Sequence, residues 1–309
     1  MSAEHNHSDE HDEHSPLDEL VTVRDLIRYG VTRFNRAGLF FGHGLQDAYD
    51  EAVYLVLHTL HLPLDRLEPF MDACIPSDER GDVLDVIHRR VDERVPAAYI
   101  TREAWLGDFR FYVDERVIVP RSYCAELLHQ GLTPWIVDND AVTRALDLCT
   151  GSGCLAILMA HYFPNAQIDA VDLSDDALAV AAHNVEAYGL DERVTLIESN
   201  VFSALDDRRY DLILSNPPYV TSASMSMLPE EYRHEPSMAL AAGDDGLDVV
   251  RQIIGKAAQH LTPNGVLVVE VGHNRDLVEA AFPKLEFVWL SNTSDAEKVF
   301  LLRADQLQA

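Results

Sequence analysis

Two patterns of apolar residues alternate through the last two thirds of the chain. Apolar residues at helical three-to-four spacing are expected to form helices over 153–162, 175–188, 247–260 and 274–281. Short continuous apolar runs predict strands near Leu146 and Ile168 and over 194–198, 210–215, 265–271, 286–290 and 298–302. Buried strands that alternate with helices predict an α/β fold with a parallel, doubly wound sheet.

The first third of the chain has a different pattern. From Leu20 to Val95 apolar residues recur at helical spacing, and prolines interrupt the helices. This part holds no catalytic constellation, so we interpret it as a substrate-recognition domain, with a purely structural cap as the alternative. Residues 105–119 alternate like a strand pair with a turn at Asp114-Glu115. The predicted domains are a disordered acidic, His-rich tail (1–18), a helical domain (19–103), a β-hairpin linker (104–119) and a large α/β domain (120–309).

The strand at 210–215 runs directly into Asn216-Pro217-Pro218-Tyr219. Two prolines remove two backbone donors and fix two φ angles, so this tetrapeptide is a stiff loop rather than a helix or strand. Such a loop suits the binding of a planar –NH₂ group. The Asn216 oxygen and the Pro217 carbonyl would accept its two N–H bonds, and Tyr219 would cover its face. An ordinary turn with two prolines is the alternative.

A second loop follows the first strand of the large domain. The run Ala145–Leu148 leads into Cys149-Thr150-Gly151-Ser152-Gly153, and a helical stretch comes next. Glycines at this place let the backbone approach a ligand at the start of a helix. The next strand ends in Asp172, nineteen positions after Gly153. An acidic residue at that spacing suits the two hydroxyls of an adenosine ribose.

With these two loops the chain resembles the HemK-type glutamine methyltransferases, from about Val95 to the C-terminus. Further shared segments are Pro96–Ile100, Val117–Ser122, His234–Pro236 and Gly243–Leu247. Within that family the chain is most similar to the branch that acts on large-subunit (50S) ribosomal protein L-three, often called PrmB. Pro120-Arg121-Ser122 and Cys149 favour this branch. The release-factor branch usually has Pro-Arg-Pro and a glycine at the two places.

The resemblance implies a seven-stranded, Rossmann-like class I methyltransferase domain that uses S-adenosyl-L-methionine and releases S-adenosyl-L-homocysteine. It adds a final antiparallel hairpin to the sheet and a small N-terminal helical domain joined by a β-hairpin. Asp172 would hold the ribose hydroxyls, and Asn200 stands near the adenine where the family usually has Asp. The expected cofactor-binding residues are Asp147, Thr150, Gly151, Ser152, Gly153, Asp172, Leu173, Asn200, Val201 and Asn216.

The expected reaction is methylation of the side-chain amide nitrogen of a glutamine. Its lone pair is delocalised into the carbonyl, so hydrogen-bond acceptors on both N–H bonds would favour pyramidalisation and aim the lone pair at the methyl carbon. The residues expected to act are Asn216, Pro217, Pro218 and Tyr219. No general base is required, because the proton becomes acidic as the nitrogen gains charge. His234, beside Glu235-Pro236, is therefore assigned a loop-ordering role.

Charge narrows the choice of partner. The formal net charge is −28, from 52 acidic and 24 basic residues. A nucleic-acid-binding protein needs a cationic footprint, so we expect no direct nucleic-acid binding. Acidity instead suits a basic ribosomal protein as substrate, through steering of the encounter. Adaptation to high salt is an equally good explanation of the composition.

Other features place fewer limits on function. No run of eighteen apolar residues exists, which predicts no membrane span and a cytoplasmic location. Four scattered cysteines without Cys-x-x-Cys spacing predict neither a disulfide framework nor a metal site. The four histidines of the tail, interspersed with acidic residues, are typical of a solvated arm, with metal capture as the alternative.

Three other functions remain open from the sequence. A release-factor glutamine methyltransferase would use the same chemistry on another protein. An RNA or DNA methyltransferase acting on an exocyclic amine would use the same tetrapeptide, although the acidic composition opposes it. A non-catalytic ribosome-assembly factor would not need both loops intact.

Overall fold

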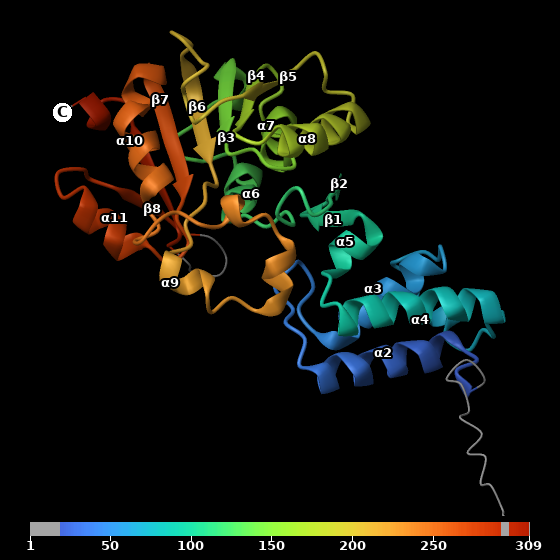
Figure 1. Ribbon diagram of the computed structural model, residues 1–309. Coiled ribbons are helices and arrows are strands. Elements are labelled where there is room, and N and C mark those ends of the chain that lie inside the picture. Colours follow the sequence, from blue (N-terminus) through green and yellow to red (C-terminus); the bar gives the residue numbers. More distant parts are fainter. Residues whose placement is uncertain (1–18, 292–296, 309) are drawn as a thin grey trace, which may run out of the picture. The chain divides into compact units, whose positions relative to one another are not determined.

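The structure is a computed structural model that describes residues 19–291 and 297–308 (Figure 1). The predicted acidic tail at 1–18 lies outside the described residues. The chain divides into two compact units, one formed by the residues up to Phe41 and by Leu45–Ala97, the other by Gly42–Gly44 and Ala98–Ala309.

The first unit is helical. The helices are α2 (Val23–Ala37), α3 (Ala48–Thr59), η1 (Glu68–Phe70) and α4 (Ser77–Asp92), and α2, α3 and α4 pack against one another. Thr22 begins α2 with a capping box, in which its hydroxyl accepts the Asp25 backbone N–H and the Asp25 carboxylate accepts the Thr22 N–H. Inside the unit, the buried Arg90 guanidinium donates to Glu51 at 2.6 Å.

The second unit contains, within the described residues, a seven-stranded sheet in the order β5-β4-β3-β6-β7-β9-β8. Its strands are β3 (Arg144–Leu148), β4 (Gln167–Asp172), β5 (Val194–Glu198), β6 (Tyr210–Ser215), β7 (Leu261–Glu270), β8 (Val288–Leu290) and β9 (Val299–Arg303). The first five strands pair in parallel, and β9 is antiparallel to both β7 and β8. The predicted α/β fold and its final antiparallel hairpin are confirmed.

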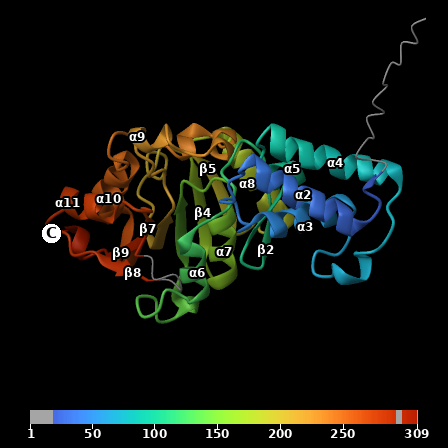
Figure 2. The same cartoon turned by 90° about the horizontal axis from the view of Figure 1, so that it is seen from below.

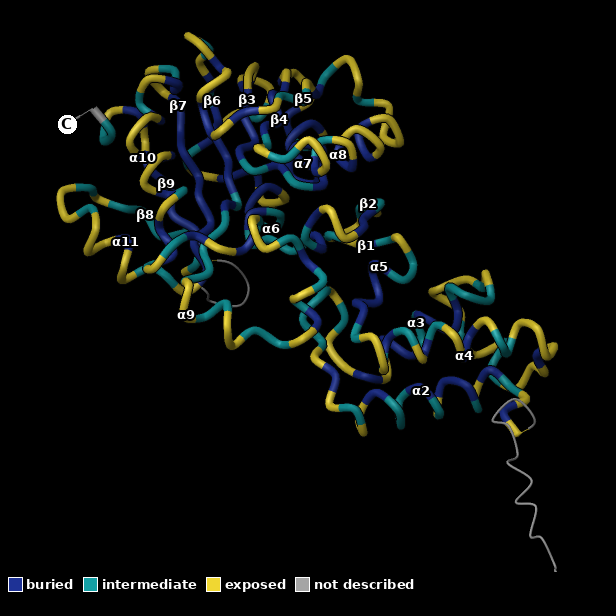
Figure 3. Tube along the Cα trace, in the orientation of Figure 1, coloured by how far each residue is buried: buried dark blue, intermediate teal, exposed yellow. Residues whose placement is uncertain are grey.

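The second unit also contains helices within its described residues, several of which pack against this sheet. They are α5 (Ala97–Thr101), α6 (Tyr123–His129), α7 (Cys154–Tyr162), α8 (Asp175–Ala187), α9 (Ser222–Met225), α10 (Asp248–His260) and α11 (Arg275–Ala281), with short η2 (Asn139–Ala141), η3 (Glu230–His234), η4 (Ser237–Ala239) and η5 (Gln306–Gln308). Alternate strand residues, such as Leu146 and Leu148, form one core with α10 and α11. Figures 1 and 2 show these two helices side by side, and Figure 3 shows the buried strands.

The strand order creates the place for a ligand. From β3 the chain passes to β4 on one side, whereas β6 pairs with β3 on the other side. In open α/β sheets, ligands bind at the carboxyl ends of the strands where the order reverses. The glycine loop follows β3 and the Asn-Pro-Pro-Tyr loop follows β6, so both loops meet at this point. In Figure 1 the arrowheads of β6 and β7 point toward the segment that contains α9.

The predicted turn at Asp114-Glu115 is wrong. The hairpin pairs β1 (Glu103–Leu106) with β2 (Phe109–Tyr112) and turns at Gly107-Asp108. Gly107 has φ 60°, a left-handed conformation that glycine adopts without the steric cost of a Cβ atom. Gly107-Asp108 is itself a two-residue hairpin signal, whereas the prediction placed the turn at the acidic pair Asp114-Glu115.

Candidate active site

Two cavities lie at the carboxyl ends of β3 and β6, and both are lined by Ile118, Asn216 and Ala239. The Asp172 cavity is also lined by Arg116, Val117, Cys149, Gly151, Val171, Asp172, Leu173, Ser174, Ala177, Ser199, Asn200, Val201, Pro218, Pro236, Met238 and Val249. The Tyr219 cavity is also lined by Arg121, Tyr123, Pro217, Tyr219, Val220, Thr221, Ser224, Leu228, Tyr232, Leu240, Gly272, His273, Asn274 and Lys298. Asn216 therefore borders both spaces.

The glycine loop lines the Asp172 cavity with backbone rather than long side chains. Cys149, Gly151 and Gly153 all have positive φ, at 62°, 54° and 78°. A Cβ atom at Gly153 would come 3.2 Å from the Cβ of Ala181 on α8, so a glycine there lets the loop pack closely on that helix. The loop thus presents its backbone to the cavity just before α7 begins.

Asp172 is held at the end of β4 by the loops around it. Its Oδ2 accepts the Gly151 backbone N–H at 2.9 Å, and its Oδ1 accepts the Ser174 N–H at 3.0 Å. Burial raises the pKa of this carboxyl above its usual range, although the backbone donors oppose the change. Each oxygen keeps a lone pair, so the carboxylate is an acceptor for hydroxyl groups in the cavity.

The residues expected to bind a cofactor fall into two groups. Gly151, Asp172, Leu173, Asn200, Val201 and Asn216 line the Asp172 cavity. Asp147, Thr150, Ser152 and Gly153 do not line it and are buried behind its wall. A role of these four residues in cofactor binding stays a prediction.

Asp147 is the most unusual member of the buried group. Its side chain is fully buried; Oδ2 accepts the Thr150 hydroxyl at 2.6 Å, and Oδ1 has no hydrogen-bond partner. Burial raises the pKa of Asp147 to about 7.

Asn216 is oriented by the loop that precedes α6. Its Nδ2 donates to the Arg121 carbonyl oxygen at 3.3 Å. With the amide nitrogen used in this way, the Asn216 Oδ1 is left as an acceptor at the border of the two cavities. Pro217 and Tyr219 line the Tyr219 cavity, whereas Pro218 faces the Asp172 cavity.

Tyr219 is fixed from several sides. Its hydroxyl donates to Glu270 Oε1 at 3.3 Å, and its carbonyl accepts from Asn274 Nδ2 at 2.7 Å. A Cβ atom at Gly272 would come 2.7 Å from the Tyr219 ring, and one at Gly246 would come 2.5 Å from the Tyr219 carbonyl oxygen. Only glycines at these two places leave room for the ring and the backbone in this position.

Glu270 ties the end of β7 to the start of α6. Its Oε2 accepts the Ser122 hydroxyl at 2.7 Å and the Tyr123 backbone N–H at 2.9 Å. Burial raises the pKa of Glu270, and these donors oppose the rise. Glu270 was not among the predicted site residues, although an acidic residue near the end of the apolar run 265–271 is a signal that could have pointed to it.

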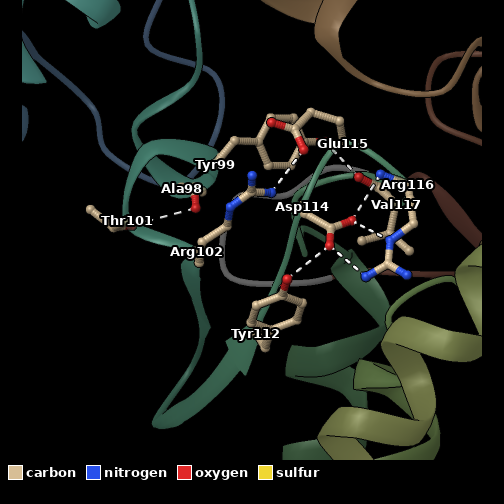
Figure 4. Close-up of polar contacts among 9 residues, drawn as sticks. All are labelled: Ala98, Tyr99, Thr101, Arg102, Tyr112, Asp114, Glu115, Arg116 and Val117. Atoms are coloured by element: carbon tan, nitrogen blue, oxygen red, sulfur yellow. Dashed lines mark hydrogen bonds and ion pairs between the residues drawn. The ribbon is translucent and has the colours of Figure 1, made fainter.

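A polar network supports the segment that leads into the site (Figure 4). The Arg116 guanidinium donates to both Asp114 oxygens, at 2.8 and 2.6 Å, and Tyr112 donates to Asp114 Oδ2 at 2.9 Å. The Tyr99 hydroxyl donates to the Val117 carbonyl at 2.5 Å. Arg116 and Val117 both line the Asp172 cavity, and neither was predicted from the sequence.

Asn184 connects this segment to the glycine loop. Its Nδ2 donates to the carbonyl oxygens of Tyr112 and Ser152, at 3.0 and 2.9 Å, and its Oδ1 accepts the Tyr112 N–H at 2.8 Å. A buried amide on α8 thus joins β2 to the glycine loop. Nothing in the local sequence pattern distinguishes this asparagine from a surface residue of a helix.

Within residues 19–291 and 297–308, no group of three or more His, Cys, Asp or Glu side chains is arranged to hold a metal ion. Cys74, Cys124, Cys149 and Cys154 are free thiols. Across the same residues, no helix combines the length and the apolar composition needed to cross a membrane.

Comparison with known proteins identifies the class. The family model described as "Methyltransferase small domain" matches residues 126–230. Among solved structures, the hMettl16 catalytic domain in complex with MAT2A 3'UTR hairpin 6 has a TM-score of 0.50 and 15% identity, over 73% of this chain and 81% of that chain. That likeness concerns the fold alone. The second unit is a class I S-adenosylmethionine-dependent methyltransferase fold.

Curated relatives identify the family within that class. A "Ribosomal protein uL3 glutamine methyltransferase" of Neisseria gonorrhoeae (strain ATCC 700825 / FA 1090) is 60% identical over 94% of this chain and 96% of its own length. Relatives of the same name from Bordetella pertussis (60%, 94% and 97%) and Xanthomonas campestris pv. campestris (49%, 94% and 94%) agree. The chain belongs to the ribosomal protein uL3 glutamine methyltransferase family, and the resemblance inferred from the sequence is confirmed.

Proposed function

We propose that the protein transfers a methyl group from S-adenosyl-L-methionine to the side-chain amide nitrogen of one glutamine in large-subunit ribosomal protein uL3. The observation that most strongly supports this function is the position of Asn216 on the border of two cavities. A methyl donor in one cavity and an amide in the other would meet at this side chain.

The Asp172 cavity fits the cofactor by its donor and acceptor groups. The Asp172 carboxylate is available to the ribose hydroxyls, and the Gly151 backbone allows close approach. Val171, Leu173 and Val201 offer apolar contact to an adenine ring, beside the polar Asn200. When bound, the cofactor supplies a methyl group already activated on a sulfonium, so the task of the protein is orientation.

The Tyr219 cavity suits the glutamine amide. The Asn216 Oδ1 and the Pro217 carbonyl oxygen accept the two amide N–H bonds, and the fixed Tyr219 ring forms a wall. Acceptors placed in this way favour a pyramidal nitrogen, whose lone pair is less delocalised into the carbonyl group. No side chain needs to act as a base, because the nitrogen becomes acidic once it is methylated. Burial and the neighbouring Glu270 raise the pKa of Tyr219, so the phenol stays neutral.

The acidic composition supports a basic protein as substrate. A formal charge of −28 would attract a basic ribosomal protein and repel nucleic acid. Since ribosomal proteins are made and assembled in the cytoplasm, that compartment is the one we propose.

The test is a methylation assay with full-length purified protein and labelled cofactor. We expect label in uL3 and none in uL3 variants in which the modified glutamine, located by mass spectrometry, is replaced by asparagine. Peptide release factor and ribosomal RNA are tested as alternative substrates, for release-factor methylation and RNA methylation. Labelling of release factor in preference to uL3 would replace the proposed target, and labelling of RNA would overturn the proposed reaction.

A further inference from the structure

A buried carboxylate, Glu235, pairs with Arg121, which lines the Tyr219 cavity. Glu235, just after η3, accepts from Arg121 Nη1 and Nη2 at 2.5 and 2.6 Å, and its Oε1 also accepts the Val119 backbone N–H at 3.0 Å. The Glu235 side chain has no exposed surface, whereas that of Arg121 is 27% exposed. We call Val119, Arg121 and Glu235 the clamp.

The rings of Tyr232 and His43 pack next to the clamp. The Arg121 guanidinium lies 5.2 Å from the centre of the Tyr232 ring, and the His43 ring lies 4.6 Å from that same ring. His43 Nε2 is 3.6 Å from Glu235 Oε1. Burial would raise the pKa of Glu235, but His43 and Arg121 outweigh it and lower that pKa to about 2. The carboxylate is therefore charged throughout the neutral range.

The clamp acts on both cavities through its neighbours. Tyr232, three residues before Glu235, lines the Tyr219 cavity, and Pro236, the next residue, lines the Asp172 cavity. On the other side, the Arg121 carbonyl accepts the Nδ2 of Asn216 at 3.3 Å. Arg121 also closes its own loop by donating to the Val119 carbonyl at 3.0 Å.

An asparagine side chain has two ends of nearly equal shape and opposite hydrogen-bonding character. If Asn216 turned over, its NH₂ group would face the amide nitrogen of the substrate, and donor would meet donor. The Arg121 carbonyl prevents this because it accepts only from the nitrogen end. The position of that carbonyl depends in turn on the bidentate pair with Glu235, since such pairs fix geometry as well as charge.

Resting on the function proposed above, we infer that Glu235 and Arg121 are positioning residues that hold Asn216 with its oxygen toward the acceptor nitrogen. Neither residue has to touch the reacting atoms. Their contribution is to the rate of methyl transfer once both substrates are bound, because they determine which end of Asn216 meets the amide.

The test is a double-mutant cycle between Glu235→Gln and Asn216→Asp, measured as kcat and KM with cofactor and uL3. A carboxylate at position 216 has an oxygen at both ends and needs no orientation. We expect Glu235→Gln to lower kcat by about 10- to 100-fold beside Asn216 but by less than about threefold beside Asn216→Asp. The KM for the cofactor should change much less than kcat. An equal fold-loss in both backgrounds would overturn the inference.

Two further variants separate positioning from general loosening of the fold. Arg121→Lys keeps the charge but makes one hydrogen bond where there were two, so kcat should fall between wild type and Glu235→Gln. Glu231→Gln alters another buried carboxylate of the same segment and should leave kcat within about threefold. If Glu231→Gln lowered kcat as far as Glu235→Gln, the effect would belong to the whole segment and the inference would fail.

The cycle also distinguishes this inference from the proposed function. Wild-type protein that does not label uL3 would sink the proposed function before any variant is compared. Wild-type protein that labels uL3, with additive variants, would leave that function intact and remove only the positioning role.

Discussion

The loops that follow β3 and β6 lie side by side but hold their ligand-facing groups by opposite means. The glycine loop has three left-handed residues within five positions, and it offers mostly backbone to its cavity. The Asn-Pro-Pro-Tyr loop has no such residue and offers side chains. Those side chains are fixed by Arg121, Glu270 and Gly272, and Asn274 holds the Tyr219 carbonyl, all from outside the loop.

The difference follows from what each loop has to do. A ligand bound through ribose and backbone contacts needs close approach, and small residues give it without a network of side chains. A weakly nucleophilic amide needs acceptors in defined directions, so its loop must be braced. The buried carboxylates differ accordingly: Asp147, behind the glycine loop, lacks a charged partner, whereas Glu235 is paired with Arg121.

The largest expected effect is that of Asp147 on the pH dependence of the free energy of unfolding. Its pKa of about 7 in the folded state exceeds the ordinary 3.8, so the folded protein binds this proton more tightly than the unfolded chain. This proton contributes to the free energy of unfolding. Its contribution is fully present below pH 3.8 and falls by about 4 kcal/mol as the pH rises to about 7. Asp147→Asn should remove this loss between pH 4 and 7, as measured by urea unfolding. Parallel pH profiles for the two proteins would contradict the buried, unpaired state.

The next effect concerns catalysis. Asn216→Ala removes the acceptor on the border of the cavities, so uL3 methylation should fall by at least about 10²-fold. Because we propose that the cofactor binds mainly against the glycine loop, its dissociation constant should change far less. Asn216→Asp keeps an acceptor and should retain more activity than Asn216→Ala. Near-wild-type rates for both variants, in a radiolabel assay, would refute the braced-acceptor account.

A smaller effect is expected on the other side of the site. Asp172→Ala removes the charged acceptor for the ribose and should weaken cofactor binding by about 1–3 kcal/mol. Isothermal titration calorimetry with the cofactor product measures this directly. Glu198→Ala, an exposed acidic residue at the end of the neighbouring β5, is the matched control and should bind as wild type does. Unchanged affinity in Asp172→Ala would remove Asp172 from the cofactor site.

The smallest effect tests the backbone of the glycine loop. Cys149 has φ 62°, a conformation that costs a non-glycine residue about 1–2 kcal/mol. Cys149→Gly removes that cost, but the added flexibility of the unfolded chain lowers the free energy of unfolding by about 0.5–1 kcal/mol. The midpoint of denaturant unfolding should therefore rise slightly or stay the same. A clear loss of stability would mean that the Cys149 thiol contributes packing that outweighs the backbone cost.

The local pattern was enough for most of the fold. The apolar spacing of the strands and helices, together with the two loops, predicted the doubly wound sheet. This was possible because the spacing that identifies each element lies within its own segment of the sequence. The turn of the hairpin was placed wrongly, since two polar turn pairs, Gly107-Asp108 and Asp114-Glu115, lie seven positions apart and only the strand pairing selects the first. Placing Asn216 and Asp172 near one another was also possible, because parallel strands bring their carboxyl ends to one edge.

The sequence by itself determined which chemistry is available: an amide, two prolines and a tyrosine after one strand, and glycines with a distant acid around another. Only the tertiary structure decided how these groups are held. Glu235 meets Arg121 across 114 positions, and Glu270 meets Ser122 across 148. Such pairs depend on how separate strands and loops pack, and no periodicity records them. The same packing leaves Asp147 buried without a charged partner, because burial is a property of the folded sheet and not of the apolar run 145–148 that contains this residue.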